Sequence, residues 1–337
     1  MVGAANTGNK AAASTTTDTF HFGSMYVYTY PLNLPAYRKI ARGFLQVIDK
    51  VWFQHNRRFF LFMQKSSINS RFTAPLEWQP ELFLQKGIFS ALAAQFPLAQ
   101  QRHFPSPELL TAWLHQHTEL QDWCFVDSTV LDADGRYYED FISQTRQIPM
   151  RADNWHDLFG ALIWCLFPKS KRVMNQLHMA QIQQFGTKER SKIRHKLTLL
   201  DECGVLLCIQ PSQRFLLDLL RDHQWTEAFY QHKNLWAELN PIIFGHANYE
   251  MATKPFIGLT AKLWCIELPS GLTCPDTEGY DFVDNLLAAQ LVQAELLLDN
   301  QQLSPLPLLG VPGWHQQAQD LAFYADTSYF RPKRHTT

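Results

Sequence analysis

His156 is the first residue in the chain whose surroundings indicate chemistry. It lies in the stretch RADNWHDLFGALIW, at the start of a strongly apolar segment. Asp153 or Asn154 can cap a helix here, and an acid such as Asp157 favours the positive helix end. His156 would be repelled by that end if protonated, and it lies beside the apolar stripe, while Gly160 one turn later leaves its imidazole uncovered. Capping therefore explains the acids but not the histidine.

A second histidine occurs in the stretch FGHANYE. His246 and Glu250 are four residues apart, which places them on one face of a helix. Asp201 and Glu202, in the stretch LLDECG, offer further carboxylates. Neutral imidazoles with carboxylates suit either a transition-metal centre or a general acid–base pair, and the residue types do not choose between the two.

We predict that polar side chains from these stretches face one cavity. The residues predicted to carry the chemistry are Asp153, His156, Asp157, Asp201, His246 and Glu250. His156 acts as base or ligand and Glu250 orients His246; these three are the candidate ligands of a divalent metal. The competing interpretation is purely structural, because interior ion-pair networks also gather histidines with acids.

A basic segment spans residues 169–196, which hold eight Lys or Arg residues and a single acid. Lys188, Arg190, Lys192 and Arg194 are candidates for contact with a phosphate-containing ligand or RNA, because closely spaced cations release counterions from a polyanion. The competing interpretation is a solvated helix face, since a charge run alone carries no sequence readout.

Composition excludes several classes of protein. Thirty basic and 31 acidic residues give a net charge of -1, so no global field attracts nucleic acid or membrane. The six cysteines form no Cys-x-x-Cys pair and are interpreted as thiols of a reducing cytosol. Motifs of P-loop, dinucleotide-binding, nucleophile-elbow and zincin enzymes are absent. The longest apolar run is far shorter than the ~20 residues that span a bilayer, so we predict a soluble cytoplasmic protein.

The pattern of apolar residues predicts an α+β fold, a mainly helical single domain with a small buried β-sheet. Residues 1–24 are expected to form a disordered tail, 25–303 the α+β domain, and 304–334 an extended arm packed on it through Trp314 and Phe330. Predicted helices cover residues 35–55, 81–96, 107–121, 154–167, 168–184, 212–222, 245–253 and 280–298. Predicted strands are 123–130, followed by a DADG turn, a hairpin over 196–210 that turns at 201–204, and 260–268.

Several stretches in fixed order carry a family resemblance. They are RADNWHDLFGALIWCLFPKSKRVMNQLH, IRHKLTLLDECGVLL, FGHANYE, GLTAK, PLPLLGVPGW and FYADTSYFRPKR. With these, the chain resembles the bacterial DUF3025 family of uncharacterised proteins from about residue 35 to residue 334. The resemblance implies no reaction. The residues themselves favour a hydrolase-like enzyme, metal-assisted or acid–base, and the alternative is a phosphate- or RNA-binding adaptor that uses segment 169–196, with its charged clusters purely structural.

Overall fold

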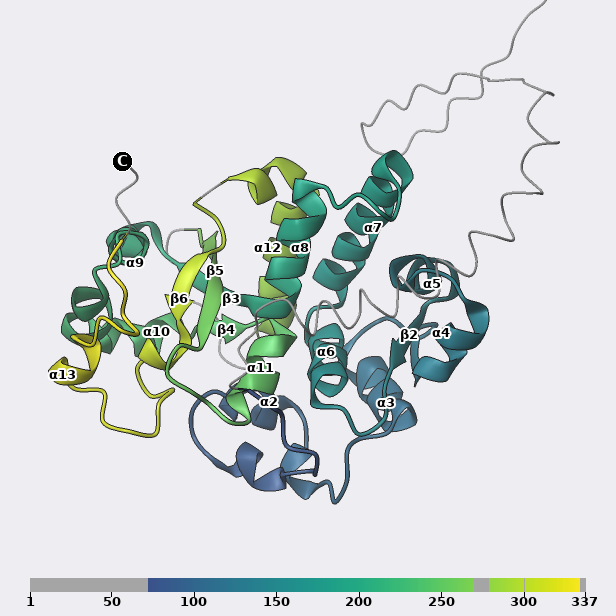
Figure 1. Cartoon of the computed structure of the whole chain (residues 1–337), viewed down its shortest axis with the longest axis horizontal. Helices are drawn as coiled ribbons and strands as arrows, with labels where there is room; N and C mark the ends of the chain where they lie inside the picture. Colours follow the sequence, from purple (N-terminus) through teal and green to yellow (C-terminus); the bar gives the residue numbers. More distant parts are fainter. Residues whose placement is uncertain (1–71, 270–278, 300, 334–337) are drawn as a thin grey trace, which may run out of the picture. The chain divides into compact units, whose positions relative to one another are not determined.

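The computed structural model describes residues 72–269, 279–299 and 301–333 of the chain (Figure 1). The helices there are α2 (Ser90–Gln95), α3 (Pro107–His117), α4 (Ser128–Asp134), α5 (Tyr138–Thr145), α6 (Trp155–Leu166), α7 (Pro168–Phe185), α8 (Lys192–Cys203), α9 (Arg214–Arg221), α10 (Trp236–Leu239), α11 (His246–Ala252), α12 (Tyr280–Val292) and α13 (Leu321–Tyr324). The fold is mainly helical α+β, as predicted. The predicted tail 1–24 and helix 35–55 lie outside the described residues.

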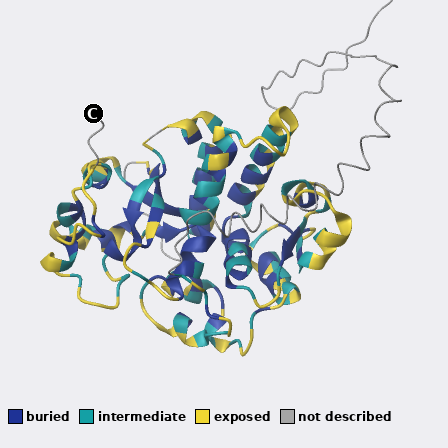
Figure 2. Ribbon diagram, in the orientation of Figure 1, coloured by how far each residue is buried: buried dark blue, intermediate teal, exposed yellow. Residues whose placement is uncertain are grey.

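Two small sheets accompany the helices. Their strands are β1 (Cys124–Asp127), β2 (Gln147–Met150), β3 (Gly204–Ile209), β4 (Ile242–Ile243), β5 (Thr260–Glu267) and β6 (Ser304–Pro307). β1 pairs with β2, and the larger sheet has the order β4-β3-β5-β6, in which β3 and β5 are parallel. Every residue of β3 is buried, so this strand is covered on both faces, as its double-sided apolar pattern predicts (Figure 2).

The predicted hairpin over residues 196–210 is wrong in its first half. That half belongs to α8, which begins after Ser191, whose hydroxyl accepts a hydrogen bond from the Arg194 N–H. Leu197 and Leu200 are buried together on one side of the helix. The stretch LTLL satisfies the periods of both a strand and a helix, so its periodicity alone does not decide between them. Only the second apolar run is a strand, β3, and it pairs with β5.

A glycine with positive φ interrupts or ends two other elements. The predicted helix 81–96 consists of a 3-10 turn (Pro80–Leu84) followed by α2, with Gly87 between them at a φ of 124°. The predicted DADG turn is the end of α4, where Gly135 takes the left-handed conformation. The predicted helix 107–121 is α3, which ends at residue 117.

The predicted boundaries and the predicted buried stripe of helix α6 are confirmed. Asn154 caps it, because the side-chain oxygen accepts the N–H of Asp157 at 3.0 Å. The buried stripe residues are Trp155, Leu158, Phe159, Leu162, Ile163, Leu166 and Phe167. The helix packs against α3, α7 and α11. These contacts hold its first turn, which carries His156, in a fixed position.

The C-terminal part of the described chain lies against the larger sheet. β6 pairs antiparallel with β5, and Phe330, 3% exposed, contacts the rings of Phe229 and Tyr324. Trp314 is only half-buried. The cysteines of the described residues are free thiols. In the same residues no helix combines the length and the apolar character needed to cross a bilayer.

Helix α7 begins without a capping side chain of its own. Asp284 of α12 replaces the cap: its Oδ2 accepts the N–H of Lys169 and its Oδ1 accepts the N–H of Ser170, each at 2.8 Å. Asp284 is fully buried. Two orphan N–H groups at the positive end of α7 are therefore satisfied by a distant carboxylate, which ties α12 to α7.

We expect Asp284→Ala to lower the free energy of unfolding by at least ~2 kcal/mol, because it leaves two buried N–H groups without acceptors. Asp281→Ala is the matched control on the same helix. Asp281 pairs with the Lys169 ammonium but is 75% exposed, so its loss costs less than ~1 kcal/mol. Urea unfolding of both variants measures the difference, and equal losses would contradict the capping role.

Candidate metal centre

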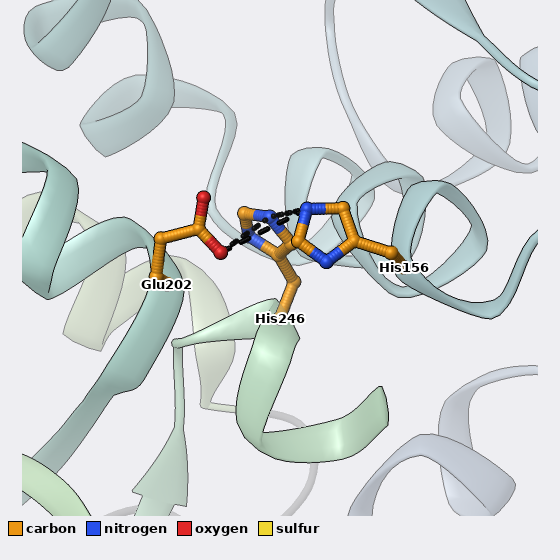
Figure 3. Close-up of side chains that lie close together, drawn as sticks. All are labelled: His156, Glu202 and His246. Atoms are coloured by element: carbon orange, nitrogen blue, oxygen red, sulfur yellow. Dashed lines mark hydrogen bonds and ion pairs between the residues drawn. The ribbon is translucent and has the colours of Figure 1, made fainter. Parts of the chain in front are cut away.

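Four side chains from three helices meet at one point in the structure. His156 lies in the first turn of α6, Glu202 in the last turn of α8, and His246 and Glu250 in α11. The centres of the two imidazole rings are 4.3 Å apart. In Figure 3 the carboxylate of Glu202 and both imidazoles point toward a common space. The structure thus brings together His156, His246 and Glu250 from the predicted set, and adds Glu202.

A close backbone contact positions Glu202 beside His246. The N–H of Gly245 donates to the Gly204 carbonyl at 2.8 Å, at the junction where α8 passes into β3 and β4 into α11. A Cβ on Gly245 would lie 2.3 Å from the Gly204 nitrogen, so no side chain fits there. Glu202 stands two residues before one glycine and His246 directly after the other. The absence of a side chain at Gly245 is therefore what lets Glu202 and His246 meet.

His156 takes part in two hydrogen bonds of 3.0 Å. Its Nδ1 faces Glu250 Oε2, and its Nε2 faces the Nε2 of His246. Because two Nε2 atoms need one donor and one acceptor, the pair shares a single proton. The prediction that Glu250 orients His246 is wrong. The Glu250 carboxylate of α11 orients His156 of α6 instead, although Glu250 and His246 belong to the same helix.

Glu202 completes the cluster. Its Oε2 lies 3.5 Å from Nε2 of His246 and 3.8 Å from Nε2 of His156. The sequence offered Glu202 only as a neighbour of Asp201, in what was predicted to be a turn. The signal that could have found it is the helical period of α8, in which Glu202 points about 100° away from Asp201 and so reaches the other side of His246.

Asp201 lies behind the cluster. Its Oδ1 is 2.5 Å from the buried ammonium of Lys171 and 3.9 Å from Nδ1 of His246. That Nδ1 is buried and forms no hydrogen bond. Asp201 is thus a charged neighbour of His246 that Lys171 keeps in place.

The surroundings shift the pKa values of His156 and His246 in opposite directions. Burial alone lowers the pKa of His156, but the Glu250 hydrogen bond and the charges of Glu202 and Glu250 outweigh it and raise the net pKa above 6.5. Burial lowers the pKa of His246. His156 therefore holds the proton between the two Nε2 atoms more strongly than His246 does, and when His156 is protonated it donates to both Glu250 and His246.

The cluster is partly exposed to solvent. The side chains of His156, Glu202 and Glu250 are 27%, 30% and 25% exposed. Burial is nevertheless the largest influence on the pKa of His156. Charges that are mostly surrounded by protein interact more strongly than charges on an open surface.

Two predicted residues do not belong to the cluster. Asp153 is exposed, with a left-handed φ of 51°, in the turn before α6. Asp157 pairs with Arg151: its Oδ1 accepts from the guanidinium at 2.8 Å and its Oδ2 from the Arg151 backbone N–H at 2.7 Å. This pairing lowers the pKa of Asp157 although burial opposes it. Both acids thus shape the start of α6.

The predicted phosphate contacts divide into two groups. Arg194 is buried, and its guanidinium donates to backbone carbonyls before α8 and to the Tyr137 hydroxyl, so it is structural. Lys188, Arg190 and Lys192 are exposed. Only these three remain accessible to a ligand.

The chain belongs to the family described as "Protein of unknown function (DUF3025)", whose model matches residues 123–334. His156, Glu202, His246 and Glu250 all lie within the matched residues. No curated protein and no solved structure is significantly similar to the chain. The resemblance is thus confirmed as membership of the family, and it assigns no reaction.

We expect Gly245→Ala to lower the free energy of unfolding by at least ~2 kcal/mol, because its Cβ would overlap backbone that cannot move independently. Gly160→Ala is the matched control. Its Cβ would lie 3.8 Å from the His246 ring, an ordinary contact, and helix propensity gains up to ~1 kcal/mol. Urea unfolding distinguishes them. Comparable stability of the two variants would show that the glycine contact is not required.

In the metal-free protein, NMR titration of the imidazoles should give His156 a pKa above 6.5 and His246 a pKa below it. Because the folded pKa of His156 is raised, its stabilising effect is complete below pH 6.5 and is lost as the pH rises through the folded pKa. Glu250→Gln should lower the His156 pKa and reduce this loss of stability. Asp153→Asn should change neither, and a pKa of His156 that does not respond to Glu250→Gln would refute the pairing.

Proposed function

We propose that the protein is a metal-assisted hydrolase, with a divalent transition metal held by His156, Glu202 and His246. The observation that carries the proposal is the convergence of two imidazole Nε2 atoms and one carboxylate oxygen, with His156 and Glu202 partly exposed to solvent. Two nitrogens and one oxygen form a donor set typical of catalytic zinc sites, in which three protein ligands leave one coordination position open.

The spacing of the three atoms supports this assignment. The sides of the triangle that they form are 3.0, 3.5 and 3.8 Å. The point equidistant from all three lies about 2.0 Å from each, which matches Zn–N and Zn–O bond lengths. Little movement of the side chains is needed for all three to coordinate one ion.

Charge supports a cation at the same point. Among the described residues, neither Glu202 nor Glu250 forms an ion pair with a lysine or an arginine; their ionic partners are the two histidines. A divalent cation would balance both carboxylates and replace the proton shared by the two Nε2 atoms. Metal and proton therefore compete for His156, as expected when an imidazole is a ligand.

Each histidine has a carboxylate behind it. Glu250 accepts the Nδ1 proton of His156, which leaves Nε2 free to coordinate. Asp201 is the corresponding acid for His246, at 3.9 Å from Nδ1, and Lys171 maintains its charge. Such outer carboxylates fix the tautomer and orientation of a ligating imidazole and make it more basic.

Hydrolysis is the reaction that this arrangement favours. A bound divalent metal of this kind supplies Lewis acidity and lowers the pKa of a coordinated water toward neutrality. The protein's contribution is to orient the two imidazoles and to place the Glu202 carboxylate beside them. The chain contains none of the sequence motifs for bound nucleotide or flavin chemistry.

The first test measures metal binding. The untagged protein, stripped with a chelator and titrated with Co²⁺ or Zn²⁺, should bind one equivalent. His246→Ala should abolish stoichiometric binding, and Glu250→Gln should weaken it by ~10–100-fold, because Glu250 acts on a ligand rather than on the metal. Asp153→Asn is the control, since this exposed acid lies outside the cluster. Absence of stoichiometric binding by the wild type sinks the metal assignment.

The second test measures hydrolysis of p-nitrophenyl acetate, p-nitrophenyl phosphate and an unstructured peptide. Activity should depend on added metal and disappear in Glu202→Gln. Activity that survives chelation and requires His156 would instead support acid–base catalysis by the imidazole pair. Metal binding without hydrolysis of any probe would overturn the hydrolase part of the proposal.

A further inference from the structure

A second concave site lies at the beginning of α8. Its walls are Arg190, Lys192, His195 and Lys196, with Leu298 from the 3-10 turn after α12, and it encloses about 510 Å³. This volume falls in the range of small-molecule sites, ~300–1,000 Å³. No acid of the described residues lines it, so the charges that these residues bring to the pocket are positive.

The cations of this pocket are Arg190, Lys192 and Lys196. None of them forms an ion pair with an acid of the described residues, and Arg190 donates to the hydroxyl of Thr198. By contrast, Arg194 and Lys171, from the same basic segment, are buried and fully engaged. A solvated helix face would not gather its charges around a hollow, so the pocket is better explained as a site for an anion.

His195 reports the positive potential inside the pocket. Burial lowers its pKa first, and the charges of Arg190, Lys196 and Lys262, the last from β5, lower it further. Charges of one sign held close together are unfavourable, and a bound anion relieves that cost. A bound anion would therefore raise the pKa of His195 again.

We propose that this pocket binds the phosphate group of a small organic phosphate. An arginine fork and two lysine ammonium groups match a multiply charged oxyanion better than a single carboxylate. Leu298, 47% exposed, and the aliphatic stems of the cations offer an apolar wall for the organic part.

The pocket also has a defined place relative to the candidate metal centre. His195 and Glu202 are seven residues apart on α8, which places them on the same side of the helix and about 10 Å from each other along its axis. A phosphate held here would direct an attached group toward Glu202. This last step, a phosphorylated substrate for the metal centre, rests on the proposed function, whereas phosphate binding itself does not.

Binding is tested with inorganic pyrophosphate on the metal-free, full-length protein, followed by calorimetry and by the NMR signals of His195. Saturable binding below ~10 mM is expected, together with an increase in the His195 pKa. Replacing Arg190, Lys192 and Lys196 by Gln should weaken binding at least ~10-fold. The control replaces Lys86, Arg102 and Lys254 by Gln; these exposed cations lie outside the pocket, and the change in net charge is the same.

Three outcomes would overturn the proposal: no saturable binding, equal losses in the two triple variants, or binding of a single-stranded RNA oligonucleotide without binding of pyrophosphate. The metal centre is tested separately. His246→Ala should retain pyrophosphate binding while it loses metal, and the pocket variant should retain metal. Failure of either site is therefore recognisable without reference to the other.

Discussion

The contact between the backbones of Gly204 and Gly245 is the constraint on which the candidate site depends. It joins the end of α8 to the beginning of α11 at a separation that no side chain allows. Glu202 and His246 flank this contact, so their approach follows from the backbone and not from their own attraction. Helix α6 then adds His156 by packing on α11, with Gly160 lying against the ring of His246.

Pairing of charges separates Asp157 and Asp201 from the two glutamates of the cluster. Asp157 and Asp201 each have a nearby cation, Arg151 and Lys171 respectively, and their ionised forms are stabilised inside the protein. Glu202 and Glu250 face imidazoles instead, whose charge depends on pH. Pairing two partly desolvated carboxylates only with titratable groups is not the arrangement that stability alone favours, because desolvated charges are costly unless firmly paired.

The site could be predicted from the sequence only where the spacing of apolar residues fits a helix and not a strand. Helix α6 has a wide apolar stripe and a capping residue, so its start and the position of His156 followed directly. Glu202 could not be predicted as a site residue, because LTLL fits strand and helix equally. In a turn, the direction of the Glu202 side chain relative to that of Asp201 is undefined. The partner of Glu250 is set by how α6 and α11 cross. The position of Asp153 is set by its own left-handed backbone conformation. Neither is encoded in local spacing.

The parallel pairing of β3 with β5 has a consequence for how the site comes into existence. The connection between these strands contains β4 and α11, so His246 belongs to a crossover that begins just after Glu202. Parallel strands form late because a long loop must close before its contacts repay the entropy. A growing or unfolded chain consequently offers isolated histidines and carboxylates, which hold metal poorly. On the proposed function, the complete set of metal ligands is therefore present only in the folded chain.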